Sequence, residues 1–423
     1  MFKVFANAWK IPDIRKKLLF TLMLLVVFRF GTFIPVPFVS ADQLKQLIGD
    51  GNSLFSMLDI FSGGAFSNAT IFAMSITPYV NSSIIMQLLT VAIPALERLS
   101  KEGEEGRKKI AQWTRYLTIV LAFIQATGLF FGLRAAFTRR DVLAFIVVTL
   151  TFTAGTAFLM WLGEQINEKG IGNGISLLIF AGIVSRLPQM ISAFVQYNKN
   201  GVLNWFTTLL ILVFALAIIA LVVLMNNAER RIPVQYAKRV VGRKMYGGQS
   251  THIPIKVAMA GVLPIIFAVS IISFPATIAQ FVGVTANSGG FWGGFLKVFS
   301  QGSPVYMILY FILIIFFTYF YTEMQYNPIE MANNMKKNGG FIPGIRPGKP
   351  TSDFIRSVLN KITLVGAVFL ALVAVLPMLL TNSVGAGIAF GGTSVLIMVG
   401  VALETVKQLE SQMMMRHYKG FLD

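Results

Sequence analysis

The stretch SLFSMLDIFSGGAFSNATIFAMSITPYVNSSIIMQLL, residues 53–89, decides how this chain can fold. It is apolar enough to enter a membrane, but Asp59, the pair Gly63-Gly64 and Pro78 interrupt it. In lipid, every backbone polar group needs an internal partner and a charged side chain is costly. The stretch therefore needs a role that a uniform membrane helix does not have.

The composition of the whole chain indicates an integral membrane protein. Of 423 residues, 55% are hydrophobic and 13% are charged, and the mean hydropathy is +0.69. These values are not typical of a soluble globular protein. Residues 1–17 carry five Lys or Arg residues and one acid, and the apolar run that follows is long enough to remain in the bilayer, so we expect no removable signal peptide. The chain has no cysteine, which excludes disulfides, thiolate metal sites and thiol nucleophiles.

Apolar runs of about 20 residues predict ten membrane spans. They lie near residues 18–37, 71–93, 116–133, 142–163, 175–195, 203–225, 257–281, 305–325, 362–380 and 388–406. Alternating loops then place 28 Lys and Arg residues on one side and 6 on the other, with Arg29 and Arg186 inside spans. The positive-inside rule predicts that both termini are cytoplasmic.

The even count predicts an all-α integral membrane fold of ten transmembrane helices in two pseudo-symmetric, inverted halves of five. The expected divisions are a cytoplasmic N-terminal segment, a first half, an external linker, a second half and a cytoplasmic tail: 1–17, 18–195, 196–203, 204–406 and 407–423. The cytoplasmic loops 226–256 and 326–361 are longer than a helix connection requires, which indicates that they bind something.

The sequence lacks the residue patterns that the main classes of membrane enzyme need. Both histidines, His252 and His417, lie in predicted cytoplasmic segments, and there is no HExxH motif or intramembrane carboxylate pair. No base is visible beside a membrane serine. The glycines of EKGIGNGIS (168–176) lack the preceding strand and following Lys-Ser of a phosphate loop. We therefore expect no enzyme activity, no catalytic or metal-binding residue and no cofactor.

A secondary transporter of a small solute is the main alternative, because broken helices and inverted halves are typical of that class. Ion-coupled carriers usually have titratable groups near the midplane, whereas Glu164 and Glu323 lie at cytoplasmic helix ends. Arg29 and Arg186 are explained by snorkelling or by interhelical pairing. A conduit that is not driven by ions fits this pattern better.

Several motifs, taken together, resemble the SecY family of bacterial preprotein translocase subunits. They occur in that family's order and cover essentially the whole chain: PYVNSSIIMQLLTV (78–91), MWLGEQINEKGIGNGIS (160–176), QYAKR (235–239), QSTHIPIKV (249–257), AGVLPIIFA (260–268), FIPGIRPG (341–348) and GGTSVLI (391–397). The resemblance implies a channel that conducts unfolded secretory preproteins across the bacterial cytoplasmic membrane and releases transmembrane segments laterally into lipid.

The resemblance also implies that residues 53–66 form a short re-entrant helix, the plug, which blocks the pore from the outside. About fourteen residues at about 1.5 Å each reach about 21 Å, less than the roughly 30 Å hydrocarbon layer. From the residues alone, an ordinary re-entrant or external amphipathic loop fits equally well. The implied plug residues are Leu54, Phe55, Met57, Leu58, Asp59, Ile60, Phe61, Gly63 and Gly64.

The motifs further imply a pore ring of aliphatic side chains and a lateral gate. The ring residues carried over from the family are Val80, Ile84, Ile179, Ile183, Ile266 and Ile397, and the gate residues are Gln87 and Gln125. Residues four apart lie on one helix face, so the pairs Val80/Ile84 and Ile179/Ile183 are consistent with a ring. Without the resemblance, lipid contact or helix packing would explain the ring residues, and a plain interhelical hydrogen bond would explain the glutamines.

The partners implied by the resemblance are the motor ATPase SecA, the translating ribosome, and the membrane subunits SecE and SecG. Arg243 and Lys244 in VGRKMYGG, and Arg346 in FIPGIRPGKP, are the expected contacts for SecA or the ribosome. The Pro-Gly pairs on both sides of Arg346 favour a turn that presents its guanidinium outward. Most other basic residues in these loops need do no more than set the topology.

Overall fold

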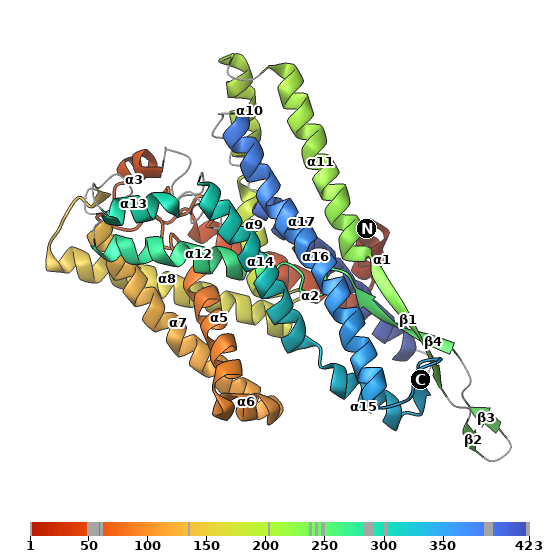
Figure 1. Ribbon diagram of the computed structural model, residues 1–423. Coiled ribbons are helices and arrows are strands. Elements are labelled where there is room, and N and C mark those ends of the chain that lie inside the picture. The colour runs from red at the N-terminus through yellow and green to blue at the C-terminus, as the bar shows by residue number, and fades with distance from the viewer. Residues whose placement is uncertain are drawn as a thin grey trace.

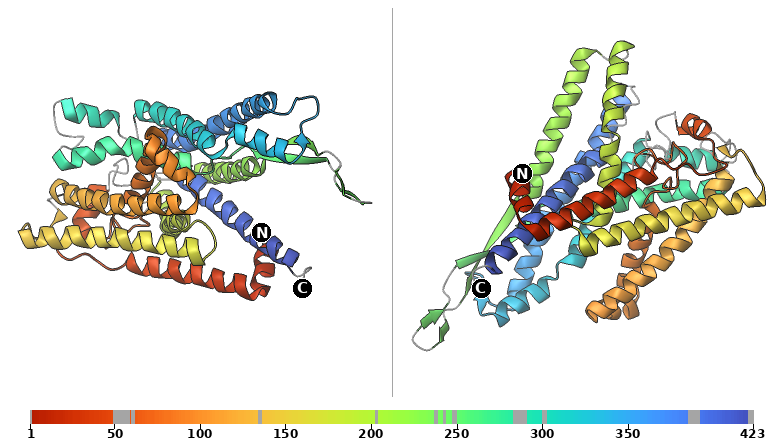
Figure 2. Two further views of the ribbon diagram at one scale, coloured as in Figure 1. Left: turned by 90° about the horizontal axis from the view of Figure 1, so that it is seen from below. Right: turned by 180° about the vertical axis from the view of Figure 1, so that it is seen from behind.

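The structure is a computed structural model, and most of the chain is described by it. The described residues are 2–48, 59, 62–133, 136–201, 204–236, 239–241, 244–246, 250–282, 291–299, 303–384 and 392–419. Most of them are helical, and Figures 1 and 2 show long helices packed side by side. The helices of residues 2–199 are α1 (Phe2–Lys10), α2 (Pro12–Gly31), α3 (Ala41–Ile48), α5 (Thr77–Ala92), α6 (Pro94–Lys101), α7 (Glu104–Gly132), α8 (Val142–Lys169), α9 (Gly174–Ser185) and α10 (Leu187–Lys199). The later helices are α11 (Trp205–Asn227), α12 (Leu263–Val282), α13 (Phe291–Val298), α14 (Pro304–Gln325), α15 (Pro328–Lys337), α16 (Lys349–Val384) and α17 (Gly392–Lys419).

Each of the ten predicted spans coincides with one of these helices or, for 175–195, with the pair α9 and α10. Among the described residues, six segments are long and apolar enough to cross a bilayer, namely α7, α8, α9 with α10, α11, α14 with α15, and α16. The pair α5 and α6, bent by 102°, makes a seventh. The remaining predicted spans lie on α2, α12 and α17, so the structure is consistent with ten crossings.

Several helices differ from the predicted spans at their ends. The helix α5 begins at Thr77 rather than near residue 71, because residues 62–76 form a chain of turns with positive φ at Gly63, Gly64, Ala69 and Ser75. The span expected at 175–195 is divided at Arg186, where α9 ends and α10 begins with Pro188 in its first turn. Proline lacks the N–H that would continue the hydrogen-bond ladder, which explains the break.

The two long loops fold together, and they contain the strands of the protein's described part. The strand β1 (Glu229–Tyr236) pairs antiparallel with β4 (Ser250–Lys256), in a register from Glu229–Lys256 to Gln235–Ser250, and with β5 (Gly340–Phe341). The short strands β2 (Arg239–Val241) and β3 (Lys244–Tyr246) form a second hairpin. Apolar side chains from both loops share one buried cluster: Ile232, Val234, Ile255, Met335, Ile342, Ile355 and Leu359.

Segments far apart in the sequence lie together at the ends of the molecule. The β1–β4 hairpin projects from one end of the molecule, and the junction of α10 with α11 lies at the opposite end (Figures 1 and 2). Ala8 of α1, Ile14 of α2, Ile171 and Leu409 of α17 form one buried cluster, so segments near both chain ends and the turn before α9 meet.

Apart from the junction of α10 with α11, two main contacts join the helices of the two predicted halves in the described part of the chain. The helix α12 packs against α5 and α7, and α17 packs against α9. Within the second half, α14 packs against α12 and α16. The functional site described next lies where these two contacts come together.

Candidate functional site

Six aliphatic side chains from four helices lie in one buried cluster at the contact between the halves. None of the six is more than 9% exposed, and all belong to the largest apolar cluster of the described residues. They are Val80 and Ile84 on α5, Ile179 and Ile183 on α9, Ile266 on α12 and Ile397 on α17. These are the six residues that the family motifs predicted for a ring; the structure brings all six into this cluster, and their role as a ring stays a prediction.

Local structure explains why these side chains meet. The i,i+4 spacing places each pair on one face of α5 or α9. The Ser82 hydroxyl donates to the Thr114 carbonyl (2.8 Å), which ties α5 to α7. On α17, the Thr393 hydroxyl lies 3.2 Å from the Tyr310 hydroxyl of α14, within hydrogen-bond distance. Two of the four helices that carry these aliphatic residues, α5 and α17, are therefore held to a neighbouring helix by a side-chain hydrogen bond.

Asp59 and a segment of turns, residues 62–76, lie against this cluster. Ser62, Ala65, Phe66 and Ala69 are almost completely buried. Backbone bonds join the end of the segment to the chain after α2, because the Val36 N–H donates to the Ala69 carbonyl and the Ile71 N–H donates to the Ile34 carbonyl. Of the nine predicted plug residues, Asp59, Gly63 and Gly64 are described, while Leu54, Phe55, Met57, Leu58, Ile60 and Phe61 lie outside the described residues.

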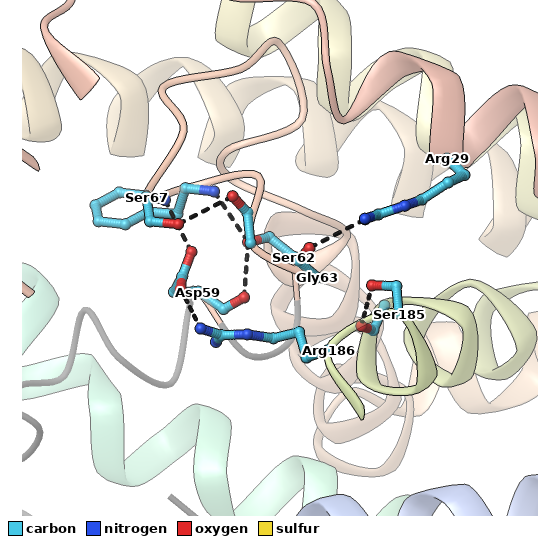
Figure 3. A network of polar contacts seen from close by, with 10 residues as sticks. Arg29, Asp59, Ser62, Gly63, Ser67, Ser185 and Arg186 are labelled. Carbon is cyan, nitrogen blue, oxygen red and sulfur yellow. Dashed lines mark hydrogen bonds and ion pairs between the residues drawn. The ribbon is translucent and has the colours of Figure 1, made fainter. Parts of the chain in front are cut away.

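Asp59 is buried and fully engaged (Figure 3). Its side chain is 2% exposed, and Oδ2 lies 2.8 Å from Nη2 of Arg186. The Ser67 backbone N–H donates to Oδ1 (2.8 Å), and the Asp59 carbonyl accepts bonds from the Gly64 N–H and the Ser62 hydroxyl. A buried carboxylate is stable only when it is paired and hydrogen-bonded, and this one is both.

A second arginine reaches the same segment. Arg29 of α2 donates from Nη1 to the Gly63 carbonyl (3.2 Å), and its guanidinium lies 4.7 Å from the centre of the Phe33 ring. Snorkelling or pairing was the sequence expectation for both arginines, and Arg186 is paired. The sequence analysis missed its partner. The available signal was that Asp59 is the one acid in residues 53–89 and Arg186 the one charged residue in its predicted span.

The predicted lateral-gate residues lie on the helices that face α12. Gln87 of α5 donates from Nε2 to the Ser83 hydroxyl (3.4 Å), and its buried Oε1 has no hydrogen-bond partner among the described atoms. Gln125 is half-buried on α7. Both glutamines therefore lie on helices that contact α12.

Of the three basic residues predicted to contact SecA or the ribosome, the structure describes the surroundings of Arg346 alone. Arg243 lies outside the described residues, and Lys244 is known only as the first residue of β3. Arg346 is exposed between Gly344 and Gly348, both of which have positive φ. Its carbonyl accepts a bond from the Thr351 hydroxyl (2.8 Å), so the turn that carries it is held to α16. In the part of the chain that the structure describes, no three His, Asp or Glu side chains gather closely enough to hold a metal ion.

Comparison with known proteins relates this geometry to a family. The SecY family model matches residues 70–406. The chain is 48% identical to a protein translocase subunit SecY of Streptomyces galbus and 49% identical to one of Bacillus licheniformis, with complete coverage of both chains in each case.

Solved structures show the same fold. A SecY structure described by its plug domain matches with a TM-score of 0.67 at 21% identity, and a protein-conducting channel matches with 0.63 at 21%; each match covers 94% of this chain and 92% of the other. Sec61 in a canine ribosome-channel complex matches with 0.59 at 20% identity over the same shares. On the full-length identity and the family match, this chain belongs to the SecY family.

Proposed function

We propose that this chain is the pore-forming subunit of a bacterial protein translocase, which conducts unfolded preproteins across the cytoplasmic membrane and releases transmembrane segments sideways into lipid. The observation that carries the proposal is the single buried cluster of six aliphatic side chains from α5, α9, α12 and α17, with the segment of Asp59 and residues 62–76 anchored against α9. The names of the full-length relatives support the same function.

The six side chains act as the narrow waist of the pore. Valine and isoleucine have restricted χ1 rotamers, so a collar made from them keeps its shape. A narrow apolar constriction excludes ions and water by dewetting, yet it can fit around a moving peptide because it makes no specific polar contacts. The collar residues are Val80, Ile84, Ile179, Ile183, Ile266 and Ile397, and in the closed channel we expect the plug to cover them from the outside.

Opening toward lipid uses the contact of α12 with α5 and α7. A signal sequence would enter between these helices and replace the contacts that α12 makes in the closed channel. Gln87 and Gln125 line this path. The unpartnered Oε1 of Gln87 supports the assignment, because a buried acceptor without a partner is costly and gains a hydrogen bond when a polar backbone group or water arrives.

The cytoplasmic side provides the docking surface. Loops 226–256 and 326–361 share one apolar cluster, which gives the exposed Arg346 a rigid support. Arg346, with Arg243 and Lys244, contacts SecA or ribosomal RNA, and such charged contacts weaken as salt increases. SecE and SecG complete the membrane complex. The chain lies in the bacterial cytoplasmic membrane with both termini inside, is divided as the sequence analysis predicts, and supplies a path rather than catalysis.

Reconstitution tests this function directly. The chain is placed in vesicles with SecE, and a preprotein is added with SecA and ATP. We expect protection of the preprotein from external protease that requires both SecA and ATP. Uptake of small solutes without such protection would contradict the proposal and favour a carrier.

A further inference from the structure

We propose that Asp59 and Arg186 form an electrostatic latch: each charge is accommodated in the closed channel only because the other is present, and this match sets how strong a signal sequence must be to displace the plug segment. The inference rests on the proposed function and adds to it the residues that determine its stringency. Three observations carry it: the burial of the ion pair, its position on one side of a glycine hinge, and the separate origins of its partners.

The burial of the pair makes the latch sensitive to the loss of either partner. The Asp59 side chain is 2% exposed and the Arg186 side chain 23% exposed, with 2.8 Å between Oδ2 and Nη2. A buried ion pair contributes little net stability, because desolvation offsets the attraction, but removal of one partner leaves an uncompensated charge. If the segment moves into the water-filled outer part of the channel, the remaining charge becomes hydrated. Loss of one partner therefore favours the displaced segment.

The pair lies on one side of a hinge. Beyond the hinge, the segment is fastened by backbone bonds, since Val36 donates to Ala69 and Ile71 donates to Ile34. Between this fastened part and Asp59 lie Gly63 and Gly64, with φ of 66° and 86°. Hinges are short stretches that absorb large changes in φ and ψ. Asp59 can thus swing about this hinge once its contacts with Arg186 and the Ser67 N–H are broken, while residues 69–71 stay fixed.

The two partners come from separate parts of the chain, Asp59 from the plug segment and Arg186 from the junction of α9 and α10. Arg186 stands at the junction of α9 and α10, next to Ser185, whose hydroxyl donates to the Gly182 carbonyl (2.7 Å). Figure 3 shows its guanidinium reaching from this junction to Asp59, while Arg29 approaches Gly63 from α2. A membrane protein buries charged side chains at a cost, so a buried pair such as this one indicates a function. Arg29 contributes a weaker second contact, because its partner is a carbonyl rather than a charge.

The latch is tested in the reconstituted complex with SecE and SecA. Two preproteins are compared, one with an intact signal sequence and one with a defective signal sequence, and the ratio of their protected amounts measures stringency. Ion conductance without any preprotein measures resting closure. The variants are Arg186→Gln, Asp59→Asn, the double variant and Arg186→Lys. The controls are Arg140→Gln and Asp42→Asn, which remove charges at exposed positions outside the segment.

The expected order follows from which charge is left unpaired. Arg186→Gln leaves the carboxylate buried, so passage of the defective preprotein relative to the intact one should rise at least about tenfold. Asp59→Asn should have a smaller effect, because the partly exposed arginine is hydrated in place. The double variant should return to within about threefold of the wild type, since coupled residues in contact do not act additively. Arg186→Lys keeps the cation and should remain close to the wild type in both measurements.

Two results would overturn the latch. One is a ratio and conductance for Arg186→Gln equal to those of Arg140→Gln. The other is a double variant whose effect is the sum of the two single effects, as expected if each side chain only supports the fold. Failure of the proposed function would give a different result, because the wild-type complex would then not protect even the preprotein with the intact signal sequence.

Discussion

Gly63 and Gly64 offer a test of how the channel is closed, because alanine at these two neighbouring positions differs mainly in what its Cβ atom would contact. Alanine at either position has a positive φ, 66° at Gly63 and 86° at Gly64, which costs about 1–2 kcal/mol for a residue with a Cβ. The new Cβ atoms have different surroundings. At position 63 it would lie 2.8 Å from Oγ of Ser185, 2.9 Å from Cα of Gly182 and 3.0 Å from its carbonyl oxygen, whereas at position 64 it meets nothing closer than 3.9 Å.

The contact with α9 sets the difference between the two variants. Ser185 can rotate its hydroxyl away, but the backbone of Gly182 cannot give way without a shift of the helix. Overpacking of this kind typically costs about 1–3 kcal/mol. Both variants should loosen the segment through backbone strain, and Gly63→Ala should favour its displacement about 5–150-fold more than Gly64→Ala.

Single-channel conductance of the reconstituted complex, without preprotein, measures the displaced population. We expect the order wild type, Gly64→Ala, Gly63→Ala in open probability, with equal folding yield and equal binding of SecE. Gly64→Ala is the matched control, because it introduces the same side chain with the same sign of φ. Equal open probability for the two alanine variants would refute the idea that this segment closes the channel by packing against α9.

Three further predictions concern the collar, the plug and the docking surface. Replacing Ile84 or Ile397 with asparagine should hydrate the apolar collar. Ion leak in the conductance assay and passage of signal-defective preproteins in the protection assay should then both rise, whereas Ile84→Val should change little. Unchanged selectivity in the asparagine variants would contradict the ring assignment. Deleting residues 55–65 should leave the fold intact by circular dichroism and thermal melting but raise leakage, and global unfolding would instead make the segment part of the structural core. Arg346→Ala should weaken the binding of SecA or ribosomes severalfold in co-sedimentation and should make that binding less dependent on salt. Lys349→Ala removes a nearby exposed charge of the same sign and should have less effect. Equal effects would indicate a general basic surface rather than a specific contact.

Much of the architecture follows from local properties of the sequence. The length of an apolar run decides whether a helix can cross the bilayer, and each predicted span coincides with one helix, or with α9 and α10 together. The distribution of Lys and Arg predicts which side of the membrane each loop lies on, and this prediction is also local, because it counts the charges in each loop separately. The identities of Val80, Ile84 and the other collar residues came instead from the family motifs, since isoleucine in a membrane helix has no local feature that distinguishes a pore from a lipid contact.

Tertiary structure decided the features that depend on residues far apart. Hydropathy does not show that α5 begins only at Thr77, because residues 71–76 are as apolar as a membrane-spanning helix. Their non-helical conformation depends on backbone hydrogen bonds from this segment to residues 34–36. The two basic loops became one β-containing unit through the pairing of β1 with β4 and β5. The pairing of Asp59 with Arg186 likewise depends on the packing of the segment against α9. Membrane insertion is determined along the chain, by the transfer of each segment into lipid, whereas the partner of a buried charge is determined only when distant segments come together.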